Sequence, residues 1–145
     1  MPHYNSDMRP GIRYTRINGR KASDYVTKRV PFTNSNKQLY GHWEGAGVPY
    51  SEGSAMRYVV YSYGDHWPLF VWDDASQRWY GNSDRHSVTT SKHRTYAHPR
   101  LATGDTTNSD TTNSDNTIHW LPLMSIRLLA REGYAALAAA RVHGA

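Results

Sequence analysis

The sequence predicts an α+β domain: an antiparallel β-meander of four to five strands, forming a twisted sheet or half-barrel, with a C-terminal α-helix and a basic N-terminal arm. Three observations lead to this prediction. Segments rich in aromatic and β-branched residues alternate with turn residues in the middle of the chain. An apolar stripe of helical period lies near the C-terminus, and positive charge is concentrated near the N-terminus. With 145 residues, the chain is long enough for one domain with a substantial core.

The basic arm is predicted at residues 1–29, where no apolar period is sustained. Residues 1–37 carry eight Lys and Arg against two Asp, whereas residues 38–100 hold six charges of each sign. Pro10 and Gly11 favour a turn, and residues 17–20 are typical of a tight turn or hairpin around Asn-Gly. We therefore expect an arm that is at most partly ordered by itself.

The β-rich domain is predicted at residues 30–100. Its strongest strand signal is residues 57–63, where Tyr and Val dominate. Gly, Asp and Ser between the apolar runs favour turns. Tyr40, Tyr63 and Tyr80 each precede a glycine, which suggests aromatic rings that cover strand ends. The strands are expected at residues 38–43, 57–63, 67–72, 78–80 and 86–92.

A flexible polar loop is predicted at residues 101–119, because the pentapeptide Thr-Thr-Asn-Ser-Asp occurs twice in succession there and has no apolar residue to bury. The C-terminal segment, residues 120–145, is expected to pack a helix of about residues 121–142 on the domain. Gly133 weakens the middle of this helix. The expected core residues are Val59, Tyr61, Leu69, Val71, Trp79, Val88, Ile126, Leu129 and Leu137.

The chain contains no cysteine, which favours a reducing compartment. Its first residues lack the apolar run of a signal peptide. The most apolar stretch carries Arg127, Arg131 and Glu132, which argues against a membrane span. We therefore expect a cytoplasmic protein that does not enter a membrane; its oligomeric state is left open.

The eight histidines do not form a recognisable metal site. His86, His93 and His98 are spaced unlike the ligands of zinc sites, and no cysteine accompanies them. The sequence predicts neither a metal nor a cofactor.

A hydrolase is the enzymatic alternative to a non-enzymatic protein. Ser87, Thr89, Thr90 or Ser91 would serve as nucleophile, His86 or His93 as base and Asp84 as acid. Neighbouring residues of a strand point to opposite faces, so these side chains would not converge. The nucleophile elbow Gly-x-Ser-x-Gly is also missing. We expect no catalytic residues.

The charge pattern favours nucleic acid, DNA or RNA, as the partner. Lysine and arginine neutralise phosphates, and interleaved tyrosines can stack on bases. Binding would be tolerant of sequence and would depend strongly on salt. The predicted contact residues on the arm are Arg9, Arg13, Arg16, Arg20, Lys21, Lys28 and Arg29. Those on the domain are Arg78, Arg85, Lys92 and Arg94.

The alternative is a protein that binds a host or virion protein. Trp43, His66 and Trp67 lie in predicted turns, where exposed aromatic side chains can anchor a partner. This group includes adaptors, inhibitors of host defence and components of a virion.

Residues 28–93 resemble a small β-rich domain of unknown function that recurs in phage and mobile-element genomes. The matching residues are 29–36, 57–64 and 87–93, together with Trp79, Tyr80 and Asn82. His86 replaces an expected tyrosine, and the loop at residues 45–55 is longer than usual. The resemblance implies a phage-like origin, a compact β domain and a location in the host cytoplasm, but no activity. The resulting prediction is a non-enzymatic accessory protein that binds nucleic acid.

Overall fold

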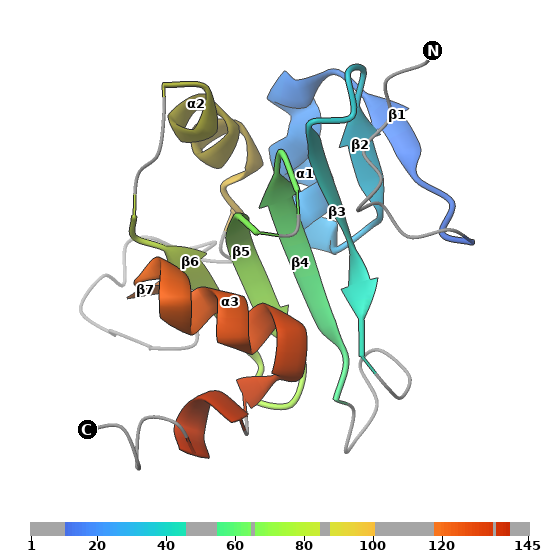
Figure 1. Cartoon of the computed structure of the whole chain (residues 1–145). Coiled ribbons are helices and arrows are strands. Elements are labelled where there is room, and N and C mark those ends of the chain that lie inside the picture. Colours follow the sequence, from blue (N-terminus) through green and yellow to red (C-terminus); the bar gives the residue numbers. More distant parts are fainter. Residues whose placement is uncertain are drawn as a thin grey trace, which may run out of the picture.

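The computed structural model describes residues 11–45, 55–64, 66–84, 88–100, 118–134 and 136–139, with only the backbone described at residues 88–90. Figure 1 shows the arrangement of its helices and strands. In chain order these are β1 (Thr15–Ile17), η1 (Gly19–Lys21), α1 (Ala22–Lys28), β2 (Phe32–Asn34), β3 (Leu39–Glu44), β4 (Arg57–Ser62), β5 (Pro68–Asp73), β6 (Arg78–Asn82), α2 (Val88–Ala97), β7 (Ile118–Leu121) and α3 (Leu123–Glu132).

The strands form one seven-stranded mixed sheet in which spatial order follows chain order. From β2 to β6 each strand is antiparallel to the next. The edge strand β1 runs parallel to β2, and the opposite edge strand β7 runs parallel to β6. The prediction of a four- to five-stranded antiparallel meander is therefore wrong, because a parallel strand extends the sheet at each edge.

The predicted strand at residues 86–92 is also wrong, since α2 occupies Val88–Ala97. Val88, Thr89 and Thr90 favour a strand locally. The topology requires a crossover at this point instead, because β6 and β7 are parallel and no short turn can connect parallel strands. Within α2, His93 and Ala97 are four residues apart and both buried, so they form the face that packs inward.

The residues predicted as a basic arm, at most partly ordered by itself, are part of the folded domain from residue 15 to residue 28. Asn18 starts η1 by accepting a hydrogen bond from the backbone N–H of Arg20 at 3.0 Å. Ala22 and Val26 of α1 are fully buried, and Ile17 of β1 is buried too. β1 is thus an edge strand of the sheet, and η1 and α1 lie in the crossover that joins it to the parallel strand β2. Residues 1–10 of the predicted arm lie outside the described residues.

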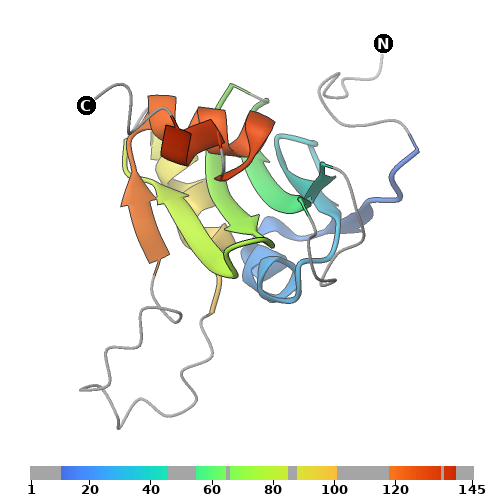
Figure 2. The same ribbon diagram turned by 90° about the horizontal axis from the view of Figure 1, so that it is seen from below.

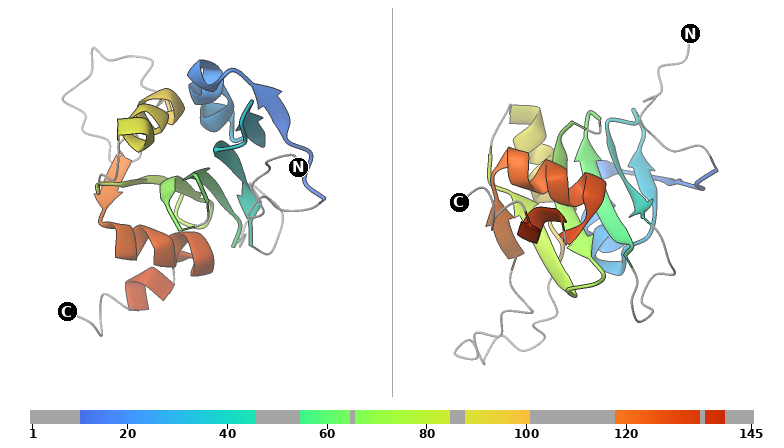
Figure 3. Two further views of the ribbon diagram at one scale, coloured as in Figure 1. Left: turned by 45° about the horizontal axis from the view of Figure 1, so that its top comes forward. Right: turned by 60° about the horizontal axis from the view of Figure 1, so that its bottom comes forward.

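Helices lie on both faces of the sheet, as Figures 2 and 3 show. On one face, α1 and α2 pack together over a cluster that includes Phe32, Tyr58 and Phe70. On the other face, α3 packs over β5 and β6, where Ile126 and Leu129 join a second cluster. The strands are buried on both faces because each face supports its own apolar layer.

The predicted core is confirmed wherever its side chains are described. Buried residues include Val59, Tyr61, Leu69, Val71, Trp79, Ile126, Leu129 and Leu137. The side chain of Val88 lies outside the described residues. The C-terminal helix α3 begins two residues after the predicted start. It ends at Glu132, before the predicted end at about residue 142, because Gly133 follows it with a φ of 94°.

Candidate functional site

Three predicted cations come together at one end of the sheet, at the top of Figure 1: Arg20 and Lys21 on η1, and Lys92 on α2. The two elements pack against each other. A Cβ atom at Gly19 would lie 4.0 Å from Cδ2 of Tyr96. Because Lys92 precedes Tyr96 by four residues, the two side chains lie on the same side of α2. All three cationic side chains are exposed.

The turn after β2 and the end of β4 complete this surface. The side-chain oxygen of Asn34 accepts hydrogen bonds from the backbone N–H groups of Gln38 and Leu39, at 3.0 and 3.2 Å. The carbonyl of Gln38 in turn accepts from the N–H of Tyr63 at 2.7 Å. The Tyr63 ring lies 5.6 Å from the His93 ring of α2. We call this surface the basic rim; it comprises Arg20, Lys21, Lys37, Tyr63, Lys92 and Tyr96.

The carboxylates of the described residues are mostly held in internal contacts. Asp73 and Asp74 are 2% and 4% exposed. Asp24 pairs with Arg100, and Asp84 accepts a hydrogen bond from the backbone N–H of Leu123 at 3.0 Å. In the described part of the chain, Arg20, Lys21 and Lys92 form no ion pair. Among the described residues, therefore, no carboxylate pairs with these three cations of the basic rim.

The other predicted cations do not join the basic rim. Arg16 is exposed on the edge strand β1, Arg13 is exposed two residues before this strand, and Lys28 lies at the far end of α1. The guanidinium of Arg29 lies 4.2 Å from the Trp72 ring centroid. Arg94 donates to the carbonyl of Asn82 at 3.0 Å. Arg78 begins β6 at the opposite end of the sheet, and Arg9 and Arg85 lie outside the described residues.

The three residues predicted to bind a protein differ in how far they are buried. Trp67 is 9% exposed and belongs to the core, while Trp43 donates from its indole nitrogen to the carbonyl of Arg29 at 2.9 Å. His66 is exposed. The two indoles thus hold the domain together, and only the imidazole is openly available to a partner.

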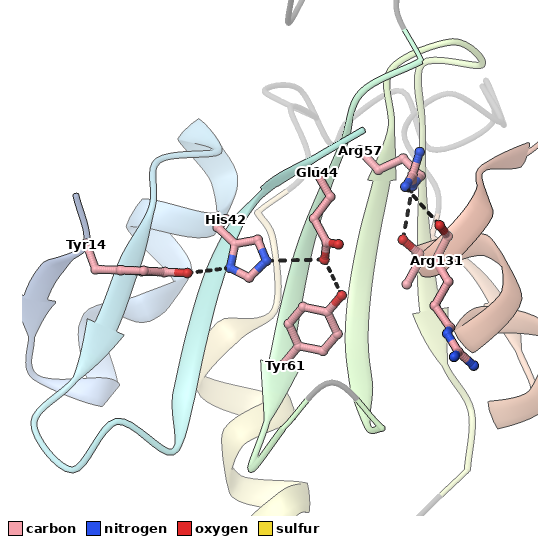
Figure 4. Close-up of polar contacts among 7 residues, drawn as sticks. Tyr14, His42, Glu44, Arg57, Tyr61 and Arg131 are labelled. Atoms are coloured by element: carbon pink, nitrogen blue, oxygen red, sulfur yellow. Dashed lines mark hydrogen bonds and ion pairs between the residues drawn. The ribbon is translucent and has the colours of Figure 1, made fainter. Parts of the chain in front are cut away.

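A polar network that the sequence did not reveal joins β3 and β4 to the residue before β1 (Figure 4). The Tyr14 hydroxyl lies 2.8 Å from Nδ1 of His42, and Nε2 of His42 lies 3.2 Å from Oε2 of Glu44. The Tyr61 hydroxyl donates to the same carboxylate oxygen. With a neutral imidazole, every contact has one donor and one acceptor when Nε2 carries the proton. His42 and Glu44 can meet because residues two apart on a strand share a face.

Arg57 forms a second buried polar group, also drawn in Figure 4. Its Nε and Nη2 donate to the carbonyls of Ala130 and Arg131 at 3.0 and 3.2 Å, and its Nη1 donates to the carbonyl of Ala55 at 2.9 Å. The side chain thus caps the C-terminal end of α3, where the helix dipole favours a cation.

His93, a residue of the hydrolase hypothesis, does have a serine partner. Its Nδ1 lies 2.7 Å from Oγ of Ser62, which is fully buried. Within the described residues no carboxylate contacts this histidine, and Asp84 instead contacts the first turn of α3. His86 and Ser87 lie outside the described residues, as do the side chains of Thr89 and Thr90. The arrangement joins α2 to β4 and does not expose a nucleophile.

His93 should make the stability of the protein depend on pH. Burial lowers the pKa of this imidazole, so the unfolded chain takes up the proton at a higher pH than the folded chain. The resulting stability is present above about pH 6.5 and is lost as the pH falls through the lower folded pKa. Urea unfolding from about pH 7.5 to about pH 5 should show this loss, and His93→Gln should reduce it. The control His66→Gln replaces an exposed histidine and should lose as much stability on acidification as the parent protein. If His93→Gln also loses as much stability as the parent, His93 is not the group responsible.

Two further observations bear on partners. Among the described residues, no group of three or more His, Asp or Glu side chains is placed to hold a metal ion. No helix in the described part of the chain has the length and apolar character needed to cross a bilayer.

Comparisons of the chain with protein-family models, with curated proteins and with solved structures find no match.

Proposed function

We propose that the protein binds nucleic acid through the basic rim without catalysing a reaction. The observation that carries the proposal is the charge arrangement: Arg20, Lys21 and Lys92 are exposed, and no described carboxylate pairs with them. Cations of this kind bind phosphates and release condensed counterions. Arg16 on the neighbouring edge strand β1, and Arg13 just before it, can extend the contact along a nucleic-acid backbone.

The folded position of these cations changes the mechanism expected from the sequence. A flexible arm loses conformational entropy when it binds, whereas η1 and α2 are already packed against each other. The proposed contact is therefore preorganised. The resemblance over residues 28–93 adds the proposal that the protein is an accessory protein of a phage or mobile element.

Neutralising the basic rim should weaken binding without unfolding the protein. The variant Arg20→Gln/Lys21→Gln/Lys92→Gln should lose roughly 30-fold in affinity at low salt, and the slope of log K against log salt should fall by roughly 2 to 3. Fluorescence anisotropy with labelled oligonucleotides at several salt concentrations measures both quantities. The three side chains are exposed, so urea unfolding should change by less than about 1 kcal/mol.

A control variant removes the same charge elsewhere. Arg78 lies at the start of β6, and Arg127 and Arg131 lie on α3 over the opposite face of the sheet from α2. Replacing these three by glutamine should lower affinity far less than the rim variant. Equal losses in both variants would show that net charge, not the basic rim, governs binding. No binding by the parent even at low salt would refute the proposed function.

A further inference from the structure

Tyr63 is an aromatic residue in a conformation that favours glycine. It follows the last residue of β4 with φ of 71°, in the left-handed region, and its side chain is 40% exposed. Bulky residues rarely adopt this region, and such strain clusters where side chains contact ligands. Lys37, in the adjoining turn, also has a positive φ of 60°. The basic rim thus places a cation, Lys37, and an aromatic ring, Tyr63, at two positions whose positive φ glycine adopts most easily.

The Tyr63 ring is supported from the side of the sheet. It lies 5.6 Å from the His93 ring at an interplanar angle of 38°. His93 is in turn fixed by its 2.7 Å contact with the buried Ser62 hydroxyl. A supported ring with an exposed surface loses little side-chain entropy when a ligand covers it. Tyr63 therefore has the properties of a stacking platform.

The elements next to this platform carry cations. Lys92 precedes His93 in α2, Lys37 precedes the residue whose carbonyl accepts from Tyr63, and η1 packs against α2 with Arg20 and Lys21. An exposed ring among cations matches a ligand that offers an unstacked base beside phosphates. In a duplex, neighbouring base pairs cover the base faces, so only single strands or unpaired ends offer them.

We infer that the basic rim recognises single-stranded nucleic acid and that Tyr63 stacks on one of its bases. The inference rests on the proposed function, to which it adds the class of ligand. It assigns Tyr63 to ligand contact and the four cations Arg20, Lys21, Lys37 and Lys92 to the phosphates on either side. Stacking tolerates every base, so sequence preference should be weak.

The test compares Tyr63→Gly and Tyr63→Phe with the parent protein. Glycine adopts the observed φ without strain, so its variant should fold at least as stably as a Tyr63→Ala variant. Binding of Tyr63→Gly to a single-stranded DNA or RNA oligonucleotide should weaken roughly 10-fold, while Tyr63→Phe stays within roughly 2-fold of the parent. Binding to a blunt-ended duplex should be the same for all three proteins. A 2-aminopurine base in the single strand should be quenched by the parent and by Tyr63→Phe but not by Tyr63→Gly.

The results separate the inference from the function on which it rests. If the parent binds duplex and single strand and Tyr63→Gly weakens neither, the stacking inference is wrong and nucleic-acid binding stands. If Tyr63→Gly weakens binding to the duplex and to the single strand equally, Tyr63 maintains the conformation of the basic rim and does not stack on a base. The single-strand inference is then wrong as well. If the parent binds no oligonucleotide at low salt, the proposed function itself is wrong.

Discussion

Replacing Arg57 by alanine is expected to lower the free energy of unfolding by about 3–4 kcal/mol. The guanidinium is 6% exposed and donates to three backbone carbonyls, two of which end α3. Without it, those carbonyls lose their partners in a place that water reaches poorly, and the negative end of the helix dipole loses its cation. Urea unfolding at constant pH measures the change.

Two variants isolate the role of the Arg57 contacts. Arg57→Lys keeps the charge but cannot span three carbonyls, so it should lose about half as much stability as Arg57→Ala. Arg131→Ala removes an exposed side chain from the same helix and keeps the carbonyl that Arg57 binds, so it should cost less than about 0.5 kcal/mol. A loss below about 1 kcal/mol for Arg57→Ala would mean that the capping contacts contribute little.

Replacing His42 by alanine is expected to cost about 3 kcal/mol. The imidazole is fully buried between the Tyr14 hydroxyl and the Glu44 carboxylate, and it packs against the Tyr40 and Tyr61 rings. Its removal leaves a cavity, takes a donor from a partly buried carboxylate and frees the residue that leads into β1. Thermal and urea unfolding should both record the loss.

A double-mutant cycle tests whether this stability depends on the network. Tyr14→Phe alone should cost about 1 kcal/mol, because it removes one hydrogen bond and keeps the ring. In the His42→Ala background the same change should cost almost nothing, which gives a coupling energy of about 1 kcal/mol. Additive effects would show that the hydrogen bond between Tyr14 and His42 contributes nothing to the stability that His42 provides.

The sequence revealed the central strands but not the edges of the sheet. Residues 57–63 and 67–72 are rich in Val, Tyr and Trp, and they form β4 and β5. The edge strands have only the few residues of Thr15–Ile17 and Ile118–Leu121, which is too short for a period-2 pattern. Their pairing depends on crossovers through α1 and α2, and no local pattern encodes the partner of a strand. The β-branched residues at the start of α2 favour a strand, so the sequence does not predict the helical crossover between β6 and β7.

For the candidate site, the sequence predicted individual charges but not their convergence. The sequence predicts a strand at Lys92, whereas this residue lies on α2, so the local pattern gives no sign that Lys92 and Arg20 lie on elements that pack together. Lys37 could have been found, since Asn-Ser-Asn before it favours a turn that exposes its side chain. His42 and Glu44 are two residues apart, and an extension of the predicted strand by one residue would have placed them on one face. Tyr14 has no comparable signal in the sequence.

The two parallel crossovers have a consequence for the order in which the chain folds. Strands β2 to β6 pair with their sequence neighbours, whereas β1 and β7 must wait for α1 and α2 to dock. These helices also depend on each other, because Ser23 donates to the carbonyl of His98 and Arg100 donates from its backbone to Thr27. Arg20, Lys21, Lys92 and Tyr96 of the basic rim lie on the two crossovers, so the rim is complete only after the edges have closed. An intermediate with a complete central meander would hold Lys37 and Tyr63 but would lack the rest of the binding surface. A bound ligand would therefore stabilise the late-forming parts of the protein above all.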